Sequence, residues 1–226
     1  MGYWEPKIVK MYRIVFLLLS SMLLFSCKEK KMDTIGMPYY NDPEFNPIFI
    51  KNKLEVSKKI THQIASFSFL NQDSIIVTQS VFKNKIHVAN FIFTTCGSIC
   101  PIMTSNFKMV SDSFKNNNHV VMLSYSVTPW IDKPSVLKKY IIKNGIKNPN
   151  WHFLTGDRTT IYKLARQSYF AEENIGFSKD SSQFLHTEHV ILVDKTNRIR
   201  GVYNGTLSLE MQHLIEDIRS LQNEVN

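Results

Sequence analysis

Two periods alternate in the distribution of apolar residues along this chain. Residues 86–94 and 120–127 form nearly continuous apolar runs, which predict strands buried on both faces of a sheet. In residues 101–114 the apolar side chains recur at helical spacing. Residues 134–143 show the same spacing and are followed by Gly145, a residue that favours the end of a helix. This part of the chain is therefore predicted to alternate strand, helix, strand and helix.

The flanking segments extend this alternation. A hairpin is predicted around residues 71–73, where turn-forming residues separate the apolar segments 64–70 and 75–78. Further along we expect a short strand, a helix, a second hairpin and a final amphipathic helix, at residues 151–154, 159–169, 190–203 and 207–221. Because strands and helices alternate before the last hairpin, the sequence predicts an α/β fold in which helices flank a mixed central sheet.

Residues 1–26 have the pattern of a secretory signal peptide. Basic residues up to Arg13 precede an apolar run at residues 14–25, which is too short to span a membrane comfortably. The run ends in L-F-S-C, which looks like a bacterial lipobox whose cysteine becomes the lipidated N-terminus. We predict a lipoprotein-type signal and lipidation at Cys27. A plain cleaved signal with an incidental cysteine is the alternative, and a start at Met11 is a second open point.

Residues 27–60 are polar and rich in turn-forming residues, so we expect a tether and an irregular lead-in there. One domain is expected over residues 61–226, with Trp130 and Trp151 packed inside it. The formal net charge is +8, but the basic residues are scattered and form no stripe interleaved with aromatic residues. This distribution argues against nucleic-acid binding. The lipoprotein-type signal predicts an exported, membrane-anchored protein that faces the periplasm or the cell exterior.

Two cysteines follow the predicted strand at residues 86–94. If Cys27 carries a lipid, Cys96 and Cys100 are the thiols that remain of the three in the chain. Cysteines four residues apart at a helix entrance lie on one side, so both sulfurs can reach one point. A helix N-terminus favours thiolate over thiol. Soft thiolates select Cu(I), zinc or iron–sulfur centres over Mg²⁺ and Ca²⁺.

The cysteine pair by itself leaves three interpretations open. An exported pair can form a structural disulfide, act as a redox couple or bind a metal. A disulfide that closes so short a loop stabilises a domain by only about 2–3 kcal/mol in the chain-entropy description. A metal site needs a further ligand, because two thiolates are too few for a closed zinc site.

The segments around the cysteines resemble the signature of the Sco (SenC) family. Residues 91–101 read F-I-F-T-T-C-G-S-I-C-P, which is similar to the family's apolar strand followed by C-x-x-x-C-P. Residues 126–134 read S-V-T-P-W-I-D-K-P and resemble the family's S-V-D-P-x-x-D-x-P segment. Residues 154–156 match its L-T-G. The H-T-x6-D pattern from His186 to Asp194 is similar to its H-S/T-x6-D block.

This resemblance covers roughly residues 60–220 and implies a thioredoxin-like fold. It also implies that Cys96, Cys100 and His186 bind one copper ion, with the histidine as the third ligand. Members of the family deliver copper to the binuclear centre of cytochrome c oxidase subunit two, or keep the cysteines of that centre reduced. The expected partners are that subunit or a similar copper acceptor, a thiol reductant and, through the lipid, a membrane.

The seven histidines differ in their positions relative to the predicted elements. His186 lies among polar residues just before the strand at 190–193 and has the family's spacing to Asp194, so we select it as the ligand. His189 falls within the strand pattern and is expected to be structural. The others have no companion signal: His62, His87, His119, His152 and His213.

Several positions depart from the family pattern. Thr128 replaces the usual acid, and Leu185 precedes His186 where many members have aspartate. Gly97 and Ser98 replace the proline and acid often found between the cysteines. None of these changes removes a ligand, so they bear on affinity and redox tuning.

The leading hypothesis is a copper chaperone, a role that requires no turnover chemistry. The runner-up is an exported thiol–disulfide reductase with Cys96 as nucleophile and Cys100 as resolving thiol. The spacing of the pair differs from the C-x-x-C of ordinary thioredoxins. A structural lipoprotein with an incidental disulfide would leave His186 without a role. The sequence leaves the chaperone and the reductase open, and the two roles are compatible.

Overall fold

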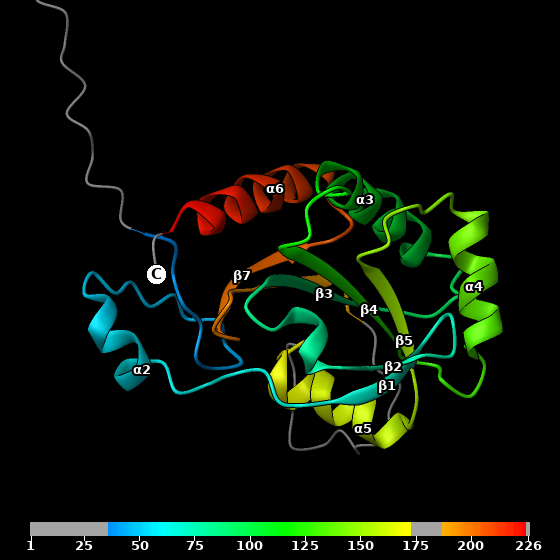
Figure 1. Ribbon diagram of the computed structural model, residues 1–226, viewed down its shortest axis with the longest axis horizontal. Coiled ribbons are helices and arrows are strands. Elements are labelled where there is room, and N and C mark those ends of the chain that lie inside the picture. Colours follow the sequence, from blue (N-terminus) through cyan, green and yellow to red (C-terminus); the bar gives the residue numbers. More distant parts are fainter. Residues whose placement is uncertain (1–35, 173–186, 225–226) are drawn as a thin grey trace, which may run out of the picture. The chain divides into compact units, whose positions relative to one another are not determined.

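The computed structural model describes residues 36–172 and 187–224. Within them a seven-stranded sheet has the order β2-β1-β5-β4-β3-β6-β7 (Figure 1). The strands are β1 (Ser68–Asn71), β2 (Ile76–Thr78), β3 (Ile86–Ile92), β4 (Val120–Ser126), β5 (Trp151–Thr155), β6 (His189–Val193) and β7 (Ile199–Asn204). The helical segments are η1 (Lys53–Glu55), α2 (Val56–Lys59), η2 (Gln79–Phe82), α3 (Ile99–Ser113), α4 (Pro134–Lys143), α5 (Arg158–Lys163), the π-helical turn η3 (Leu164–Ser168) and α6 (Ser208–Asn223).

The parallel pair β3 and β4 forms the centre of the sheet. Its register runs from Ile86 opposite Val120 to Ile92 opposite Ser126, and every residue of both strands is buried. β5 continues the parallel pairing beyond β4, whereas β6 pairs with β3 in the antiparallel direction. The mixed sheet with flanking helices confirms the fold class predicted from the apolar periodicity.

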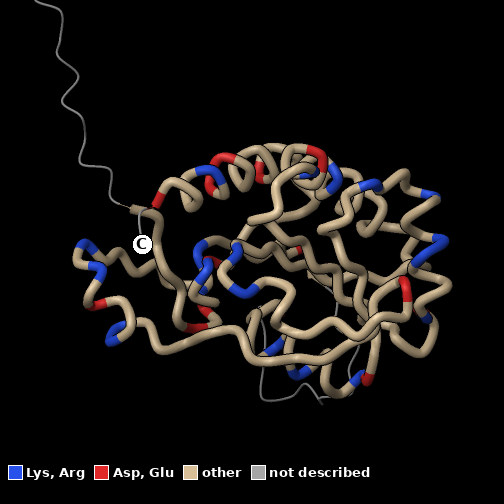
Figure 2. Tube along the Cα trace, viewed as in Figure 1, with Lys and Arg blue, Asp and Glu red and all other residues tan. Residues whose placement is uncertain are grey.

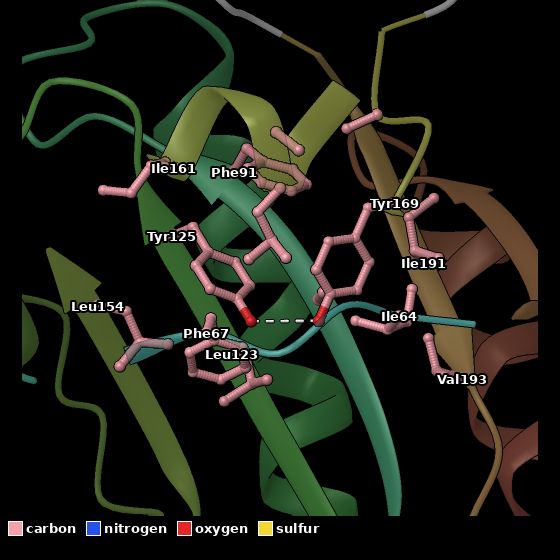
Figure 3. Close-up of a cluster of buried hydrophobic side chains, with 14 of the residues drawn as sticks. Ile64, Phe67, Phe91, Leu123, Tyr125, Leu154, Ile161, Tyr169, Ile191 and Val193 are labelled. Carbon is pink, nitrogen blue, oxygen red and sulfur yellow. Dashed lines mark hydrogen bonds between the residues drawn. The ribbon is translucent and has the colours of Figure 1, made fainter. Parts of the chain in front are cut away.

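Helices cover both faces of this sheet. Figure 1 shows α3 and α6 on one face and α5 on the other. Phe107 of α3 and Leu214 of α6 share their core with Trp151, whose ring meets that of Phe107 edge-on at 5.1 Å. Figure 3 shows the core on the opposite face, where the hydroxyls of Tyr125 and Tyr169 are hydrogen-bonded at 3.1 Å. Every helix in the described part of the chain is too short or too polar to cross a membrane.

Two of the predicted helices differ from the observed ones at their ends. α3 begins at Ile99, two residues before the predicted start at Pro101, so the second cysteine lies inside its first turn. The proline still fits, because an N–H in the first turn has no partner within the helix. The predicted helix at 159–169 is a short α5 that continues as the π-helical turn η3. α4 matches its prediction, and Gly145 beyond it has a positive φ of 61°.

The lead-in between residues 36 and 60 contains only short helical turns within an irregular path, and backbone hydrogen bonds attach it to the sheet. The Tyr40 N–H donates to the Ile199 carbonyl at 3.1 Å. The Arg200 guanidinium donates to the carbonyls of Met37 and Pro38, and Tyr39 stacks on the same guanidinium with 4.0 Å from its ring centroid to Cζ. These contacts hold the beginning of the lead-in against β7.

We expect Phe107→Ala to lower the free energy of unfolding by about 3–5 kcal/mol, since it removes a fully buried aromatic ring and leaves a cavity beside Trp151. Ile102→Ala is the matched control, because Ile102 lies on the same helix with 52% of its surface exposed. It should change the stability by no more than about 0.5 kcal/mol. Urea unfolding followed by circular dichroism measures both values. Equal losses would contradict the assigned core.

Candidate metal centre

The cysteine pair lies at the carboxyl end of the central strand β3. The chain leaves β3 at Ile92 and turns at Cys96, whose N–H donates to the Phe93 carbonyl at 3.2 Å. It then enters α3, which places Cys100 in the first helical turn. The two side chains are hydrogen-bonded to each other, and both are thiols outside any disulfide. Ligands often bind at the carboxyl ends of parallel strands in open α/β sheets, and this pair has that position.

Cys96 is the partly exposed member of the pair. Burial raises the pKa of its thiol, but hydrogen bonds from the backbone N–H groups of Cys100, Ser98 and Ile99 outweigh burial and lower the pKa below its ordinary value. These N–H groups belong to the start of α3, where they have no acceptor within the helix. The Cys96 sulfur is partly exposed, and these N–H groups favour its thiolate form, which is the form needed for nucleophilic attack or metal binding.

Cys100 has the opposite character. Only 4% of its surface is exposed, and burial raises the pKa of its thiol to about 12. A backbone hydrogen bond from Phe93 opposes this effect, whereas the Cys96 thiolate and the Asp132 carboxylate reinforce it. The pair thus combines a partly exposed thiol of lowered pKa with a buried thiol of raised pKa.

Asp132 connects the loop after β4 to the cysteine loop. Its carboxylate is fully buried and accepts hydrogen bonds from the Ser126 hydroxyl at 2.6 Å and the Thr128 hydroxyl at 2.9 Å. It also accepts bonds from the backbone N–H and the hydroxyl of Thr94, two residues before Cys96. From the sequence, Asp132 was noted only as part of a motif. Ser126 and Thr128 belong to the same motif, but Thr94 is 38 residues away, so spacing alone does not reveal that Asp132 joins the two loops.

Tyr140 is a further residue near the thiols that the sequence does not single out. Its hydroxyl is 2.7 Å from the hydroxyl of Thr104 on α3. Burial raises the pKa of Tyr140, the bond to Thr104 opposes this, and the charges of Cys100, Cys96 and Asp132 raise it further. The Tyr140 hydroxyl thus lies within the electrostatic influence of both cysteines. The helical pattern of residues 134–143 predicted the helix but not its orientation toward α3.

The surface beside the cysteine loop is partly apolar. Ile102, Trp130 and Ile131 are 52%, 48% and 42% exposed. The Arg158 guanidinium lies 5.1 Å from the Trp130 ring centroid. The expectation that Trp130 packs inside the fold is therefore wrong: Thr128 and Asp132 of this loop are buried, whereas the Trp130 side chain lies at the surface. Trp151 does pack inside, with 2% of its surface exposed.

The third predicted ligand, His186, lies outside the described residues, as does Cys27. In the described ranges no three His, Cys, Asp or Glu side chains are grouped so that they could hold a metal. The role of His186 stays a prediction. The chain is described again from Thr187, just before β6, whose first residue His189 is buried with its ring edge-on to Phe45 at 5.8 Å.

Asp194, whose spacing helped to select His186, lies at the far end of the sheet from the cysteines. β6 runs antiparallel to β3, and its last residue, Val193, pairs with His87 near the start of β3. One carboxylate oxygen of Asp194 accepts hydrogen bonds from Thr196 and from the Arg198 N–H. Asp194 thus stabilises the β6–β7 turn.

Comparison with known proteins identifies the family. The SCO1/SenC family model matches residues 56–223. The chain belongs to this family. The SCO1 protein homolog of Bacillus subtilis is 31% identical to it over 168 residues, which are 74% of this chain and 86% of the relative.

Two solved Sco structures also match the fold. The SCO1/SenC family lipoprotein of Bacillus anthracis aligns with a TM-score of 0.63 and 29% identity, covering 72% of this chain and 96% of that one. BsSco, described as a member of the Sco family of cytochrome c oxidase assembly proteins that has a disulfide switch, aligns with a TM-score of 0.61 and 31% identity. The alignment covers 73% of this chain and 95% of BsSco. The thioredoxin-like fold implied by the sequence resemblance is thereby confirmed.

The two thiols of this Sco domain should differ strongly in alkylation rate. The lowered pKa of Cys96 means that its thiolate forms at a lower pH than in the unfolded chain, so iodoacetamide should label it there. Cys100 should stay unlabelled until the pH approaches its pKa of about 12. Mass spectrometry of labelled peptides, folded and in guanidinium, measures both rates as a function of pH. Equal labelling of the two cysteines in the folded protein would contradict the assigned electrostatics.

Proposed function

We propose that this chain is a copper chaperone, which delivers copper to the binuclear site of a respiratory cytochrome c oxidase or maintains the thiols of that site. The observation that carries the proposal is the thiol pair of Cys96 and Cys100 at the carboxyl edge of β3, with one sulfur accessible and the other buried. Membership of the Sco family, one of whose members is described as a cytochrome c oxidase assembly protein, supports the proposal.

The three proposed ligand side chains suit a copper ion that the protein carries and passes on. Two thiolates are soft ligands that favour Cu(I), and a histidine nitrogen is accepted by both Cu(I) and Cu(II). In this proposal Cys96, Cys100 and His186 bind one copper ion. Binding requires both sulfurs as thiolates, so the proton of the buried Cys100 thiol leaves when the metal enters. Because Cys96 is partly exposed, a ligand of an acceptor protein can reach the ion from that side and take it by exchange.

The second candidate function, thiol–disulfide reduction, is favoured by the lowered pKa of the partly exposed Cys96 thiol. In this reaction Cys96 attacks one sulfur of a partner disulfide, forms a mixed disulfide and releases the first partner thiolate. Cys100, once deprotonated, then attacks the Cys96 sulfur and releases the second thiolate. The partner gains two electrons, and Cys96 and Cys100 become a disulfide that a thiol reductant must reduce again. This step needs no histidine ligand.

The proposal includes attachment to a membrane through Cys27 after removal of residues 1–26. Its support is the basic and apolar N-terminal pattern that ends in the lipobox-like sequence. The matching Bacillus anthracis structure is described as a lipoprotein. An exported location also fits the use of a thiol pair that can oxidise.

We expect His186→Ala to weaken copper binding by more than about 100-fold, because it removes a direct ligand. Loss of a residue that only supports a ligand typically costs about 10–100-fold in affinity. His189→Ala should keep the copper affinity and lower stability, because His189 packs against Phe45. His213→Ala, at an exposed position of α6, is the neutral control. Anaerobic Cu(I) titration against a competing chelator measures the affinities. Wild-type copper binding by His186→Ala would exclude His186 as the third ligand.

The same variants separate the chaperone from the reductase. Cys100→Ser should abolish both tight copper binding and catalytic reduction of a disulfide. His186→Ala should lose copper binding but retain disulfide reduction, because only the metal site uses the imidazole. Protein that binds no copper with all three residues intact, yet reduces disulfides, would leave the reductase as the function.

Replacing Cys27 should test the anchor. We expect Cys27→Ala either to release the protein from membranes or to block its processing, because the acceptor of the lipid is gone. Cys96→Ala should leave anchoring unchanged and serves as the matched control. Membrane fractionation and intact mass of the product give the readout. A Cys27→Ala variant that is processed and anchored like the wild type would refute lipidation at this residue.

A further inference from the structure

A cavity of about 370 Å³ lies at the end of the sheet opposite to the cysteines. It is bounded by the lead-in turns η1 and α2, the β6–β7 turn and the end of α6. Ile86, the first residue of β3, also lines it. Because Cys96 follows the other end of β3, the seven residues of this strand separate the two places by about 23 Å. Figure 2 shows basic segments of the lead-in and of the β6–β7 hairpin on this side of the molecule.

Arg198 lines this cavity as a buried arginine with few hydrogen-bond partners. Only 9% of its surface is exposed, and its Nε donates to the Ile60 carbonyl at 3.1 Å. Within residues 36–172 and 187–224, its two terminal nitrogens have no acceptor and no carboxylate partner. These nitrogens are still reachable by solvent, and Arg198 lines the cavity. A guanidinium carries a positive charge, and its terminal nitrogens are hydrogen-bond donors available to a ligand in the cavity, so the cavity favours an anion.

The two carboxylates near Arg198, Glu224 and Asp194, do not pair with its guanidinium, because both are hydrogen-bonded to other groups. Glu224 receives two bonds from Arg200, at 3.0 and 2.7 Å. One oxygen of Asp194 accepts the bonds of its own turn, and the other lies 3.4 Å from the same Arg200. Arg200 is thus fully partnered, whereas Arg198 is not.

The remaining charge around the cavity is positive. Four cationic and two acidic side chains line it, and both acids belong to the network of Arg200. Lys195 is half-buried and Lys53 is exposed, and both line the cavity beside Arg198. The phenol ring of Tyr39 and the apolar side chains of Val56 and Leu221 form other parts of the wall.

We propose that this cavity binds the phosphate group of a small phosphate ester, with Arg198 as the main anchor and Lys195 and Lys53 at its rim. Arginine offers a planar pair of donors that matches two oxygens of a phosphate. A tetrahedral phosphate has further oxygens for the two lysines, whereas a carboxylate has only two oxygens in all. The apolar wall and the volume leave room for the esterified part.

Two sources share this chemistry: a soluble phosphate ester and the headgroup of a phospholipid. The lipid source rests on the proposed anchor. Cys27 precedes Met37 by ten residues, which span at most about 35 Å when extended, so the cavity would lie within reach of a membrane surface. The binding chemistry itself does not depend on the proposed copper function.

The test is calorimetric titration of the purified full chain in detergent with inorganic phosphate. We expect saturable binding at one site per chain. Arg198→Gln should weaken it at least tenfold, and Lys195→Gln should weaken it several-fold while preserving the bond of Arg198 to Ile60. Arg219→Gln removes the same charge from an exposed position of α6 and should leave the affinity unchanged. Copper affinity should be the same in all variants, since the cysteines lie at the other end of β3.

Absence of saturable phosphate binding would overturn the proposal. Equal weakening by Arg219→Gln would also overturn it, because it would show diffuse charge attraction. If Arg198→Gln does not fold, Lys195→Gln decides: wild-type affinity in that variant refutes the site. Glycerol 3-phosphate and dibutanoyl phosphatidylglycerol, titrated in the same detergent, distinguish the sources by which one binds more tightly. If the apparent affinity for the lipid is unchanged in Lys195→Gln and Arg198→Gln, the signal comes from partition of the lipid into micelles. That result rules out the lipid headgroup as the ligand of the cavity.

Discussion

The candidate site depends on one buried group, the carboxylate of Asp132. It has no exposed surface, and burying a carboxylate without hydrogen-bond donors is very costly, so its donors have to stay in place. These donors come from the end of β4 and from Thr94, which fixes the start of the cysteine loop. Thr128, which replaces the acid usual in the family pattern, is one of them. A second carboxylate there could donate to Asp132 only in its protonated form, so the threonine suits a permanently bonded Asp132.

The difference between the two cysteines follows from where α3 begins. Because the helix starts at Ile99, the first free N–H groups of the helix surround the Cys96 sulfur, while Cys100 turns into the buried side of the first turn. For either proposed function, this asymmetry makes Cys96 the sulfur that an incoming group can reach and Cys100 the one whose proton is harder to remove. A helix that began at Pro101, as the sequence predicted, would have left both cysteines in the loop without this asymmetry.

The sequence predicted the sheet, the helices and the position of the thiol pair, because apolar periodicity and the C-x-x-x-C spacing are local signals. It did not predict the bonds from Thr94 to Asp132 or the position of Tyr140 beside Thr104, since these contacts arise when segments distant in sequence pack together. Trp130 shows the same limit: a large aromatic residue suggests burial, yet Asp132, two residues further on, is the side chain that is fully buried, and its hydrogen bonds keep it there. The resemblance to the Sco family also led to Asp194, whose carboxylate stabilises a turn far from the cysteines.

Two neighbouring arginines on the β6–β7 hairpin illustrate how a structural charge differs from one available to a ligand. Arg200 is enclosed by Glu224, Asp194 and the carbonyls of Met37 and Pro38, so it joins the lead-in, β7 and the end of α6. Removing Arg200 would break several contacts at once, and its charge is not available to bind anything else. Arg198 has a single backbone acceptor and faces a cavity with an excess of positive charge.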